Sequence, residues 1–408
     1  MIYLDYQATT PLAPEALEAM LPWLRDQHAN PHSAHRAGRV AKAAVEVARE
    51  QIAGVLPPGG RVVFTSGATE ALNWAIKGTS GPIVTVATEH AAVLDTVAAE
   101  GAKGRAVTVL PVGPDGLVDL DIARAAIVPD TGLVAAMLVN NEIGVIQPIA
   151  ELANLAHEKG ALFLCDAVQG YGRVLIPANV DLVALSAHKV HGPKGIGALW
   201  VRDGVALEPL LHGGDQEGGR SGTLSPALCA GFGVAARLMQ ERADEDRAHV
   251  ERLWSIAATL FVPREGGSPV AARTFGEGAP LHEASRNWTP ACAEVDGDRA
   301  GLDGNCGGEN GEWRLNGAAT HRYRGNLSLH FPGLDVARLM SDLRDLAFSA
   351  GSACASGSGR PSHVLRAIGL SDAQARASIR LGFGRYTTPT EMTDAVTRID
   401  AAAREQRA

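Results

Sequence analysis

The feature that most constrains the fold is an alternation, between residues 13 and 255, of short apolar runs rich in β-branched residues with stretches of helical periodicity. Seven runs predict strands, at residues 61–65, 82–87, 106–110, 133–140, 161–165, 181–186 and 196–201. The run at 133–139 is apolar throughout, as a strand covered by helices on both faces requires. The alternation predicts an α/β domain with a mainly parallel seven-stranded sheet covered by helices.

The chain changes character after a long helical segment that we expect at residues 226–260. Residues 262–311 are rich in Gly, Pro, Ser, Asp and Glu without sustained periodicity, which predicts an irregular insertion. Strands are then predicted at 326–331, 347–350 and 378–383, and helices at 335–346, 361–368 and from Pro389 onward. We expect a large domain over residues 12–258 and a smaller α+β domain from residues 1–11 and 259–408.

The composition of the 408 residues disfavours several classes of function. A net charge of −8, from 37 basic and 45 acidic residues, argues against a nucleic-acid or anionic-membrane partner. No apolar run is long enough to span a bilayer, and the start lacks the pattern of a signal peptide. The 5 cysteines are scattered and form no C-x-x-C motif, so we expect free thiols in a reducing cytoplasm.

A lysine follows the strand predicted at 181–186, at the carboxyl end where open α/β sheets bind ligands. Lys189 stands beside Ser186 and His188 and is followed by Gly192 and Pro193. This pattern suits a Schiff-base lysine whose neighbours bind a phosphate. The alternative is an ordinary solvated lysine in a polar turn.

A carboxylate follows the strand predicted at 161–165, because Asp166 comes next, with Gln169 shortly after it. A carboxylate at a buried strand end is costly unless it meets a cation. The protonated ring nitrogen of pyridoxal phosphate (PLP) is such a cation. The alternative is an aspartate that caps the following helix.

A turn at residues 65–70 joins the strand predicted at 61–65 to a helix predicted at 68–77. Its backbone N–H groups, at Ala68 among others, and the Thr69 hydroxyl can face a phosphate at the positive end of the helix. The alternative is a plain N-cap with Glu70 in the first turn. No P-loop and no G-x-G-x-x-G after a strand is present, which disfavours ATP and NAD.

Two further strand ends carry polar side chains that we expect in the same crevice. His90 follows strand 82–87, where an imidazole can stack on a cofactor ring and move protons near neutral pH. Asn141 follows strand 133–140 and offers an amide group. A lone histidine is more often structural, so the role of His90 depends on its neighbours.

The segment around Cys354 is built of small residues, which predicts a mobile, exposed catalytic loop over residues 349–360. A thiolate on such a loop can reach a target outside a cleft. Cys165, by contrast, ends a buried strand and is expected to be inert packing. Arg380 lies inside an apolar strand and needs a carboxylate, which is either a substrate or an internal ion-pair partner.

Motifs along nearly the whole chain resemble those of the cysteine desulfurases of the IscS/NifS type, which are class V aminotransferase relatives of PLP fold type I. The resembling segments are residues 4–11, 64–70, 88–90, 139–144, 166–169, 186–197, 220–223, 351–354 and 361–367. The stretch at 262–311, with Cys292 and Cys306, stands outside the resemblance, and we expect these two cysteines to be incidental.

The resemblance implies a homodimeric L-cysteine desulfurase, which makes alanine and a protein-bound persulfide with PLP as cofactor. Lys189 would hold PLP covalently, with Asp166 on the ring nitrogen, Gln169 on the ring hydroxyl and His90 stacked on the ring. The implied phosphate ligands are Ala68, Thr69, Ser186, His188 and Thr223 of the partner subunit. The implied ligands of the substrate carboxylate are Asn141, which is also counted among the cofactor ligands, Arg380 and Asn30.

Cys354 would attack the substrate sulfur and leave as the persulfide. The implied partner is a sulfur-acceptor protein, such as an iron–sulfur scaffold or a thiolation protein. We expect no metal site, apart from a transient iron–sulfur ligand role of Cys354 with a scaffold.

The chain departs from the family pattern in two loops. The segment 212–223, which carries the phosphate contact expected across the dimer, is one residue shorter than usual and lacks an arginine after Glu217. The Cys354 loop is richer in glycine, over residues 357–360, which leaves the choice of acceptor open.

Three alternatives stay open at this point. The first is another PLP enzyme of fold type I, such as a selenocysteine lyase or an aminotransferase. The second is a metalloprotein that uses His28, His32 and His35, or His188 and His191, although Pro31 interrupts the first set. The third is a catalytically dead subunit of a sulfur-transfer complex.

Overall fold

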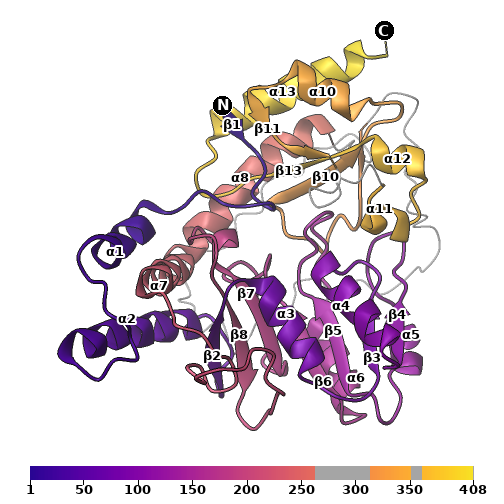
Figure 1. Ribbon diagram of the computed structural model, residues 1–408. Coiled ribbons are helices and arrows are strands. Elements are labelled where there is room, and N and C mark those ends of the chain that lie inside the picture. Colours follow the sequence, from indigo (N-terminus) through magenta and orange to yellow (C-terminus); the bar gives the residue numbers. More distant parts are fainter. Residues whose placement is uncertain (262–312, 351–360, 408) are drawn as a thin grey trace.

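A computed structural model describes residues 1–261, 313–350 and 361–407. The described chain forms a seven-stranded sheet with its helices and, beside it, a four-stranded sheet with helices of its own (Figure 1). The predicted insertion at 262–311 and most of the predicted loop at 349–360 lie outside the described residues. The division into two domains near residue 258 stays a prediction.

The seven-stranded sheet has the order β2-β8-β7-β6-β5-β3-β4. Its strands are β2 (Gly60–Thr65), β3 (Ile83–Val86), β4 (Val107–Leu110), β5 (Leu133–Met137), β6 (Leu162–Asp166), β7 (Leu182–Ser186) and β8 (Gly197–Arg202). Strand β8 runs antiparallel to both of its neighbours, and the other pairings are parallel. The predicted mainly parallel α/β sheet is confirmed, within one to three residues at each strand end.

Helices cover both faces of this sheet, which explains why its central strands β5, β6 and β7 are mostly apolar and buried. Along β6, Phe163 and Cys165 join one core and Leu164 joins the other, because successive side chains point to opposite faces. The first core includes residues of α2 (Arg36–Ala53), α5 (Leu120–Ala126), α6 (Ile149–His157) and α7 (Pro226–Glu241). The second includes residues of α3 (Ala68–Lys77) and α4 (Ala91–Ala102). Helix α1 (Pro14–Arg25) packs on α7, and with α2 it forms an arm that projects from the molecule (Figure 1).

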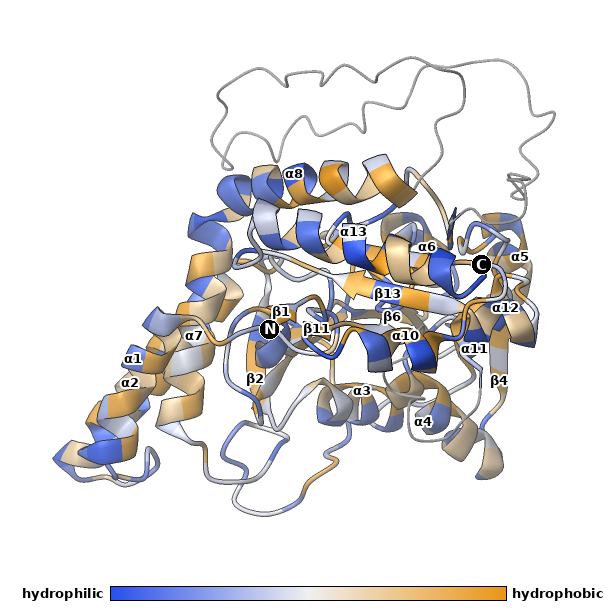
Figure 2. Cartoon of the chain, turned by 90° about the horizontal axis from the view of Figure 1, so that it is seen from above, coloured by the Kyte–Doolittle hydropathy of each residue, from blue (hydrophilic) through white to orange (hydrophobic). Residues whose placement is uncertain are grey.

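The four-stranded sheet has the order β12-β13-β10-β9. Its strands are β9 (Arg314–Leu315), β10 (Asn326–His330), β12 (Ser349–Ala350) and β13 (Ser378–Gly382). Its core is shared with α8 (Ala243–Phe261), α10 (Val336–Asp342) and α13 (Pro389–Glu405), and α8 lies alongside α13 (Figure 2). The N-terminal β1 (Ile2–Tyr3) pairs in parallel with β11 (Leu346–Ala347), and the short helices α11 (His363–Ala367) and α12 (Asp372–Arg376) complete this part.

Three predicted elements differ from the observed ones. The segment 226–260 is two helices, α7 and α8, which are interrupted at Arg242. The break lets α7 pack on α1 and α2 while Leu253 and Phe261 of α8 enter the core of the four-stranded sheet. The helix predicted at 335–346 ends at Asp342, because the chain must leave it to pair β11 with β1. The single strand predicted at 347–350 is two short strands, β11 and β12, which belong to different sheets.

Within the described residues, no helix is long and apolar enough to cross a membrane.

Candidate active site

Five strands of the large sheet, β2, β3, β5, β6 and β7, run in the same direction, so their carboxyl ends lie along one edge. The segments that follow them are the five that the sequence analysis selected. The structure therefore brings the turn at 65–70, His90, Asn141, Asp166 and Lys189 to the same edge of the sheet.

Lys189 ends a short 3₁₀ turn, Ala187–Lys189, directly after β7. Its half-buried amino group donates to the backbone carbonyl of Ala8 at 2.9 Å and also to that of Gln7. Arg173 donates to the carbonyl of Lys189 and, at 3.2 Å, to that of Gln169. The lysine is therefore held inside the molecule, and the alternative of a freely solvated lysine does not describe it.

Asp166 is the last residue of β6 and is 5% exposed. Burial raises the pKa of its carboxyl group, while the hydrogen bond from Val168 N and the charges of His90 and Lys189 lower it. Its Oδ1 accepts the Val168 N–H at 3.0 Å within a turn, so this carboxylate does not cap a helix. Asp166 is thus a buried carboxylate that a further cation would stabilise.

Glu89, next to His90, is a buried acid that the sequence analysis did not select. It is 1% exposed, and its Oε1 accepts the N–H of Met137 at 2.7 Å. Its Oε2 has no hydrogen-bond partner among the described residues. Burial, together with the charge of Asp166, raises its pKa well above the ordinary value. The Thr-Glu-His sequence gives no sign of this burial, since glutamate is usually exposed.

The turn before α3 is open at the surface. Ser66 and Thr69 are exposed, and no side chain described in the structure caps the helix at Gly67. Glu70 Oε2 accepts the N–H of Ser66 at 2.7 Å, and its Oε1 lies 2.8 Å from Nε of Arg220. The helix start therefore keeps exposed polar groups at its positive end, as an anion site requires.

His188 and His90 have different environments at this edge. His188 lies 3.2 Å from the Thr9 hydroxyl, and burial together with the charges of Lys189 and Lys194 lowers its pKa to about 4. His90 is the N-cap of α4, and its Nδ1 accepts the N–H of Ala92 at 3.0 Å. That contact places the proton of the neutral His90 ring on Nε2.

The N-terminal segment at residues 4–10 crosses between the two sheets and joins them at the site. Gln169 donates to the carbonyl of Gln7 at 2.9 Å, the same carbonyl that Lys189 contacts. The side chain of Gln7 in turn donates to the carbonyl of Gly325 at 2.9 Å. No separate role was predicted for this segment, because its contacts with Lys189 and Gln169 are made by backbone carbonyls.

Arg380 of β13 is 1% exposed and forms an internal ion pair. Its Nη2 lies 2.8 Å from Oδ1 of Asp5, and its Nη1 donates to the carbonyl of Asn141 at 3.0 Å. Asn326 donates to the same carbonyl at 3.1 Å. The structure therefore contains the internal ion pair, which is one of the two partners predicted for Arg380. The backbone carbonyl of the half-buried Asn141 accepts hydrogen bonds from two residues of the four-stranded sheet, Arg380 and Asn326.

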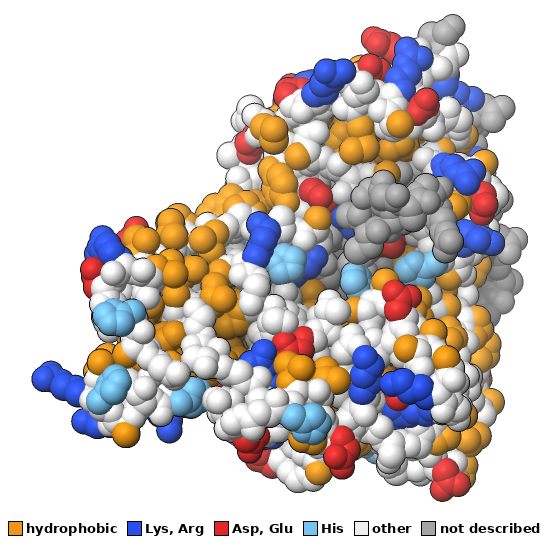
Figure 3. All heavy atoms as spheres, viewed as in Figure 1, with side chains coloured by type: hydrophobic (Ala, Val, Ile, Leu, Met, Phe, Trp, Pro, Cys, Tyr) orange, Lys and Arg blue, Asp and Glu red, His pale blue; other side chains and the backbone are white. Residues whose placement is uncertain are grey.

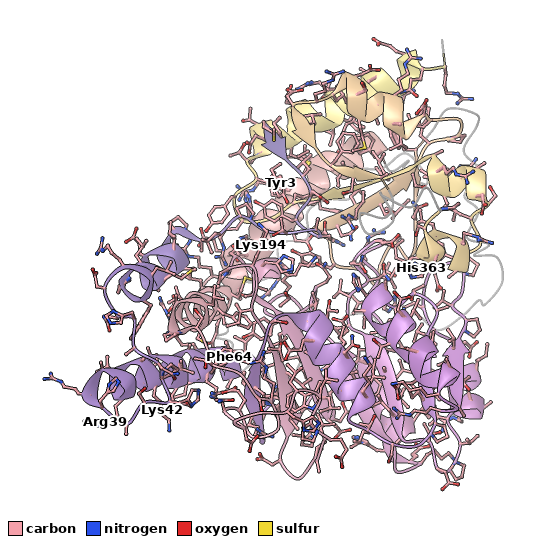
Figure 4. The ribbon with its side chains drawn as sticks, in the orientation of Figure 1. Tyr3, Arg39, Lys42, Phe64, Lys194 and His363 are labelled. Carbon is pink, nitrogen blue, oxygen red and sulfur yellow. The ribbon has the colours of Figure 1, made fainter. Side chains whose placement is uncertain are left out.

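Three predicted site residues are exposed or lie outside the described chain. Asn30 is exposed between α1 and α2, where its Oδ1 accepts the N–H of His32 at 2.8 Å. Thr223 is also exposed. Cys354 lies outside the described residues, which resume just before His363 at the start of α11 (Figure 4). His363 Nε2 lies 2.9 Å from the carbonyl oxygen of Glu89, beside His90.

Two histidines of the metalloprotein alternative, one from each proposed set, have structural contacts. His35 Nδ1 caps α2 by accepting the N–H of Gly38 at 3.1 Å, and His191 Nδ1 lies 3.0 Å from the carbonyl of Pro11. Within the described ranges, no group of 3 or more His, Cys, Asp and Glu side chains is arranged to hold a metal ion.

Comparison with known proteins agrees with this geometry. The family model described as aminotransferase class-V matches residues 2–260. The chain is 40% identical over 410 residues to cysteine desulfurase IscS of Rickettsia bellii, an alignment that covers 97% of this chain and 89% of that relative. It is 41% identical over 412 residues to a probable mitochondrial cysteine desulfurase of Schizosaccharomyces pombe, covering 97% and 73% of the two chains.

Solved structures give the same result. A NifS-like protein superposes with a TM-score of 0.79 at 29% identity and covers 98% of both chains. SspA in complex with cysteine superposes with a TM-score of 0.71 at 32% identity, covering 95% of this chain and 100% of that chain. The chain therefore belongs to the class-V aminotransferases of PLP fold type I and, among them, to the cysteine desulfurases of the IscS type.

Proposed function

We propose that this chain removes sulfur from L-cysteine, leaving L-alanine, and passes the sulfur as a persulfide on Cys354 to an acceptor protein. One observation carries the proposal: Lys189, Asp166, His90 and the turn before α3 meet at one sheet edge, in a relative of the cysteine desulfurases. An iron–sulfur scaffold or a thiolation protein is the acceptor that we expect.

The residues at this edge fit PLP in their charge and in their functional groups. Burial raises the pKa of Asp166, so a protonated pyridine nitrogen beside it would stabilise the carboxylate. The open start of α3 presents Ser66 and Thr69 to an anion at the positive end of the helix. Lys189 has its amino group within the same edge, where it contacts two backbone carbonyls.

When bound, PLP supplies the electron sink that weakens the bonds at the substrate's α-carbon. Asp166 would keep the proton on the ring nitrogen, Gln169 would bind the ring hydroxyl and His90 would stack on the ring. The proposed phosphate ligands are Ala68, Thr69, Ser186, His188 and Thr223 of the partner subunit. Lys189 would anchor the cofactor and, once displaced by substrate, move protons to and from the substrate carbon through Nζ.

The sulfur leaves the substrate by attack of the Cys354 thiolate. The S–S bond forms as the Cβ–S bond of cysteine breaks, and the electron pair of the broken bond goes to Cβ, which takes a proton to become the methyl group of alanine. Arg380 and Asn141 would position the substrate carboxylate, with Asn30, which is exposed between α1 and α2, as a weaker candidate. For Arg380, this requires the substrate to compete with or join Asp5 on the guanidinium.

We propose a homodimer, because the arm of α1 and α2 exposes apolar side chains that a partner subunit would cover. Hydrophobic side chains gather on this arm around α1 in the space-filling view (Figure 3). Leu24 of α1 is 63% exposed and Val47 of α2 is 53% exposed, so each helix of the arm presents a large aliphatic side chain to solvent. The reducing conditions that a sulfur-carrying thiol needs suggest the cytoplasm as its location.

The test is to follow alanine and sulfide release from L-cysteine, with a thiol reductant, by the PLP-loaded wild type and by Cys354→Ala. We expect the variant to lose nearly all turnover, while Cys292→Ser and Cys306→Ser keep it. Full sulfide release by Cys354→Ala would overturn the persulfide step and favour a selenocysteine-lyase type of reaction. A protein that binds PLP yet forms no alanine would favour an aminotransferase.

A further inference from the structure

An ion pair joins the turn before α3 to the loop at residues 212–223. Arg220 Nε lies 2.8 Å from Oε1 of Glu70, and its Nη2 lies 3.3 Å from Oε2. The arginine side chain is 14% exposed and the glutamate side chain 12%. Because Glu70 Oε2 also accepts the N–H of Ser66, the carboxylate that Arg220 pairs with is part of the turn itself.

The loop does not need this ion pair to stay in place, because two other arginines attach it to the sheet. Arg49 donates to both carboxylate oxygens of Glu217 at 2.8 Å, and one of these oxygens also accepts the N–H of Phe64 at 2.8 Å. Arg61 donates to the carbonyls of Glu217 at 3.0 Å and Gly218 at 2.9 Å. We therefore expect the main effect of the Arg220–Glu70 ion pair to be neutralisation of the Glu70 charge, not attachment of the loop.

That charge lies where an anion has to bind. Glu70 is in the first turn of α3, directly after Ala68 and Thr69. Burial alone would raise the pKa of Glu70, but the hydrogen bonds from Arg220 and Ser66 hold it below the ordinary value, so the carboxylate stays ionised. An ionised carboxylate without a counter-charge would repel a phosphate dianion at this turn, and partial burial would strengthen the repulsion.

We propose that Arg220 is a positioning residue for the cofactor phosphate: by pairing with Glu70, it cancels the negative charge of the turn before α3 and so allows the turn to hold a phosphate dianion. The inference rests on the proposed PLP-dependent function. Arg220 also stands three residues before Thr223, the residue proposed to reach the phosphate in the partner subunit, so one arginine would serve the phosphate groups of both subunits.

The experiment measures the affinity of the full-length apoprotein for PLP and for pyridoxal, which lacks the phosphate. Arg220→Met leaves Glu70 as an unpaired carboxylate, and we expect it to weaken PLP binding about tenfold or more, with pyridoxal binding unchanged. Glu70→Gln removes the charge but still accepts the N–H of Ser66, so it should bind PLP about as well as the wild type. The double variant Glu70→Gln with Arg220→Met should recover most of the affinity that Arg220→Met alone loses.

Two matched variants separate the charge effect from loop tethering and from misfolding. Arg61→Met removes a tether of the same loop but leaves Glu70 paired, so the addition of Glu70→Gln should give no recovery there. Arg220→Lys keeps the positive charge and should retain most of the PLP affinity even if Arg220→Met folds poorly.

The proposal is overturned if the double variant binds PLP as weakly as Arg220→Met, or if pyridoxal and PLP lose affinity equally, because both results describe a structural tether. A wild type that binds neither compound would instead overturn the proposed function.

Discussion

Glu89 and Asp166 are linked through the backbone of one residue, Met137. Met137 donates its N–H to Glu89 at 2.7 Å and is the register partner of Asp166 in the pairing of β5 with β6. Two carboxyl groups so placed in a buried region cannot both ionise at low cost. The hydrogen bond from Val168 and the charge of Lys189 favour the ionised form of Asp166, whereas the pKa of Glu89 is raised well above its ordinary value, so we expect Glu89 to hold the proton.

This arrangement predicts how Glu89→Gln changes the pH dependence of stability. The raised pKa means that folded Glu89 holds a proton that the unfolded chain releases above its ordinary value of 4.5. Folding stability is therefore lost as the pH rises from that value towards the folded-state pKa. Glu89→Gln should gain stability relative to the wild type from pH 5 to pH 8, measured as thermal unfolding midpoints of the apoprotein. Glu18→Gln, at an exposed position, is the control. The same change of midpoint with pH in both variants would contradict the prediction, because it would mean that folded Glu89 is ionised in this range.

The ion pair between Asp5 and Arg380 predicts a large cost for removing the carboxylate. Asp5→Asn leaves a guanidinium that is 1% exposed without a counter-charge, which should lower the free energy of unfolding by about 3 kcal/mol. The surface pair of Arg25 and Asp26, 73% and 60% exposed, is the matched control, and Asp26→Asn should change little. Denaturant unfolding measures the free energy of unfolding of both variants. A similarly small loss in both would contradict the prediction, because it would mean that Asp5 is not needed to stabilise the buried Arg380 guanidinium.

Buried neutral histidines predict instability in acid. Burial and the charge of Arg314 lower the pKa of His330 to about 4, from an ordinary value of 6.5. Below pH 6.5 the His330 side chain is protonated in the unfolded chain but stays neutral in the folded chain. Folding stability is therefore lost as the pH falls from 6.5 to about 4. His330→Asn should lose less stability than the wild type between pH 7 and pH 4, whereas the exposed His32→Asn should follow the wild type. Parallel curves for all three proteins would contradict the assignment.

The position of Lys189 predicts which lysine binds the cofactor. Borohydride treatment of the PLP-loaded protein should fix PLP on the peptide that contains Lys189, as peptide mass spectrometry can show. Lys189→Ala should lose this covalent label, while Lys194→Ala, an exposed lysine five residues later, should keep it. Labelling of another lysine in the wild type would refute the assignment.

The large sheet was predictable because its strands are short, mainly apolar runs, of which β5 is apolar throughout, as a strand covered on both faces requires. Once the strands are parallel, their carboxyl ends must share an edge, so residues as distant in sequence as Thr69 and Lys189 could be predicted to meet. The break at Arg242 could not be predicted from local pattern, because it serves the packing of α7 and α8 into two different cores.

What escaped prediction at the site are contacts between segments far apart in the chain. The carbonyls of Gln7 and Ala8 hold Lys189, and backbone groups carry no signal in the side-chain pattern. The partners of Arg380 and Arg220 follow from the approach of Asp5 and Glu70, which only the folded chain brings about. For Arg380, the sequence indicated the need for a carboxylate, and the tertiary structure supplied it as Asp5.

The most direct test of the central claim is mass spectrometry of the PLP-loaded protein after a single addition of L-cysteine without reductant. We predict one added sulfur atom, about 32 Da, on the peptide that contains Cys354, together with an equal amount of alanine. Cys165 and Cys229, which are buried, should remain unmodified. Alanine formed with no added sulfur on Cys354, or the added sulfur on another cysteine, would contradict the account.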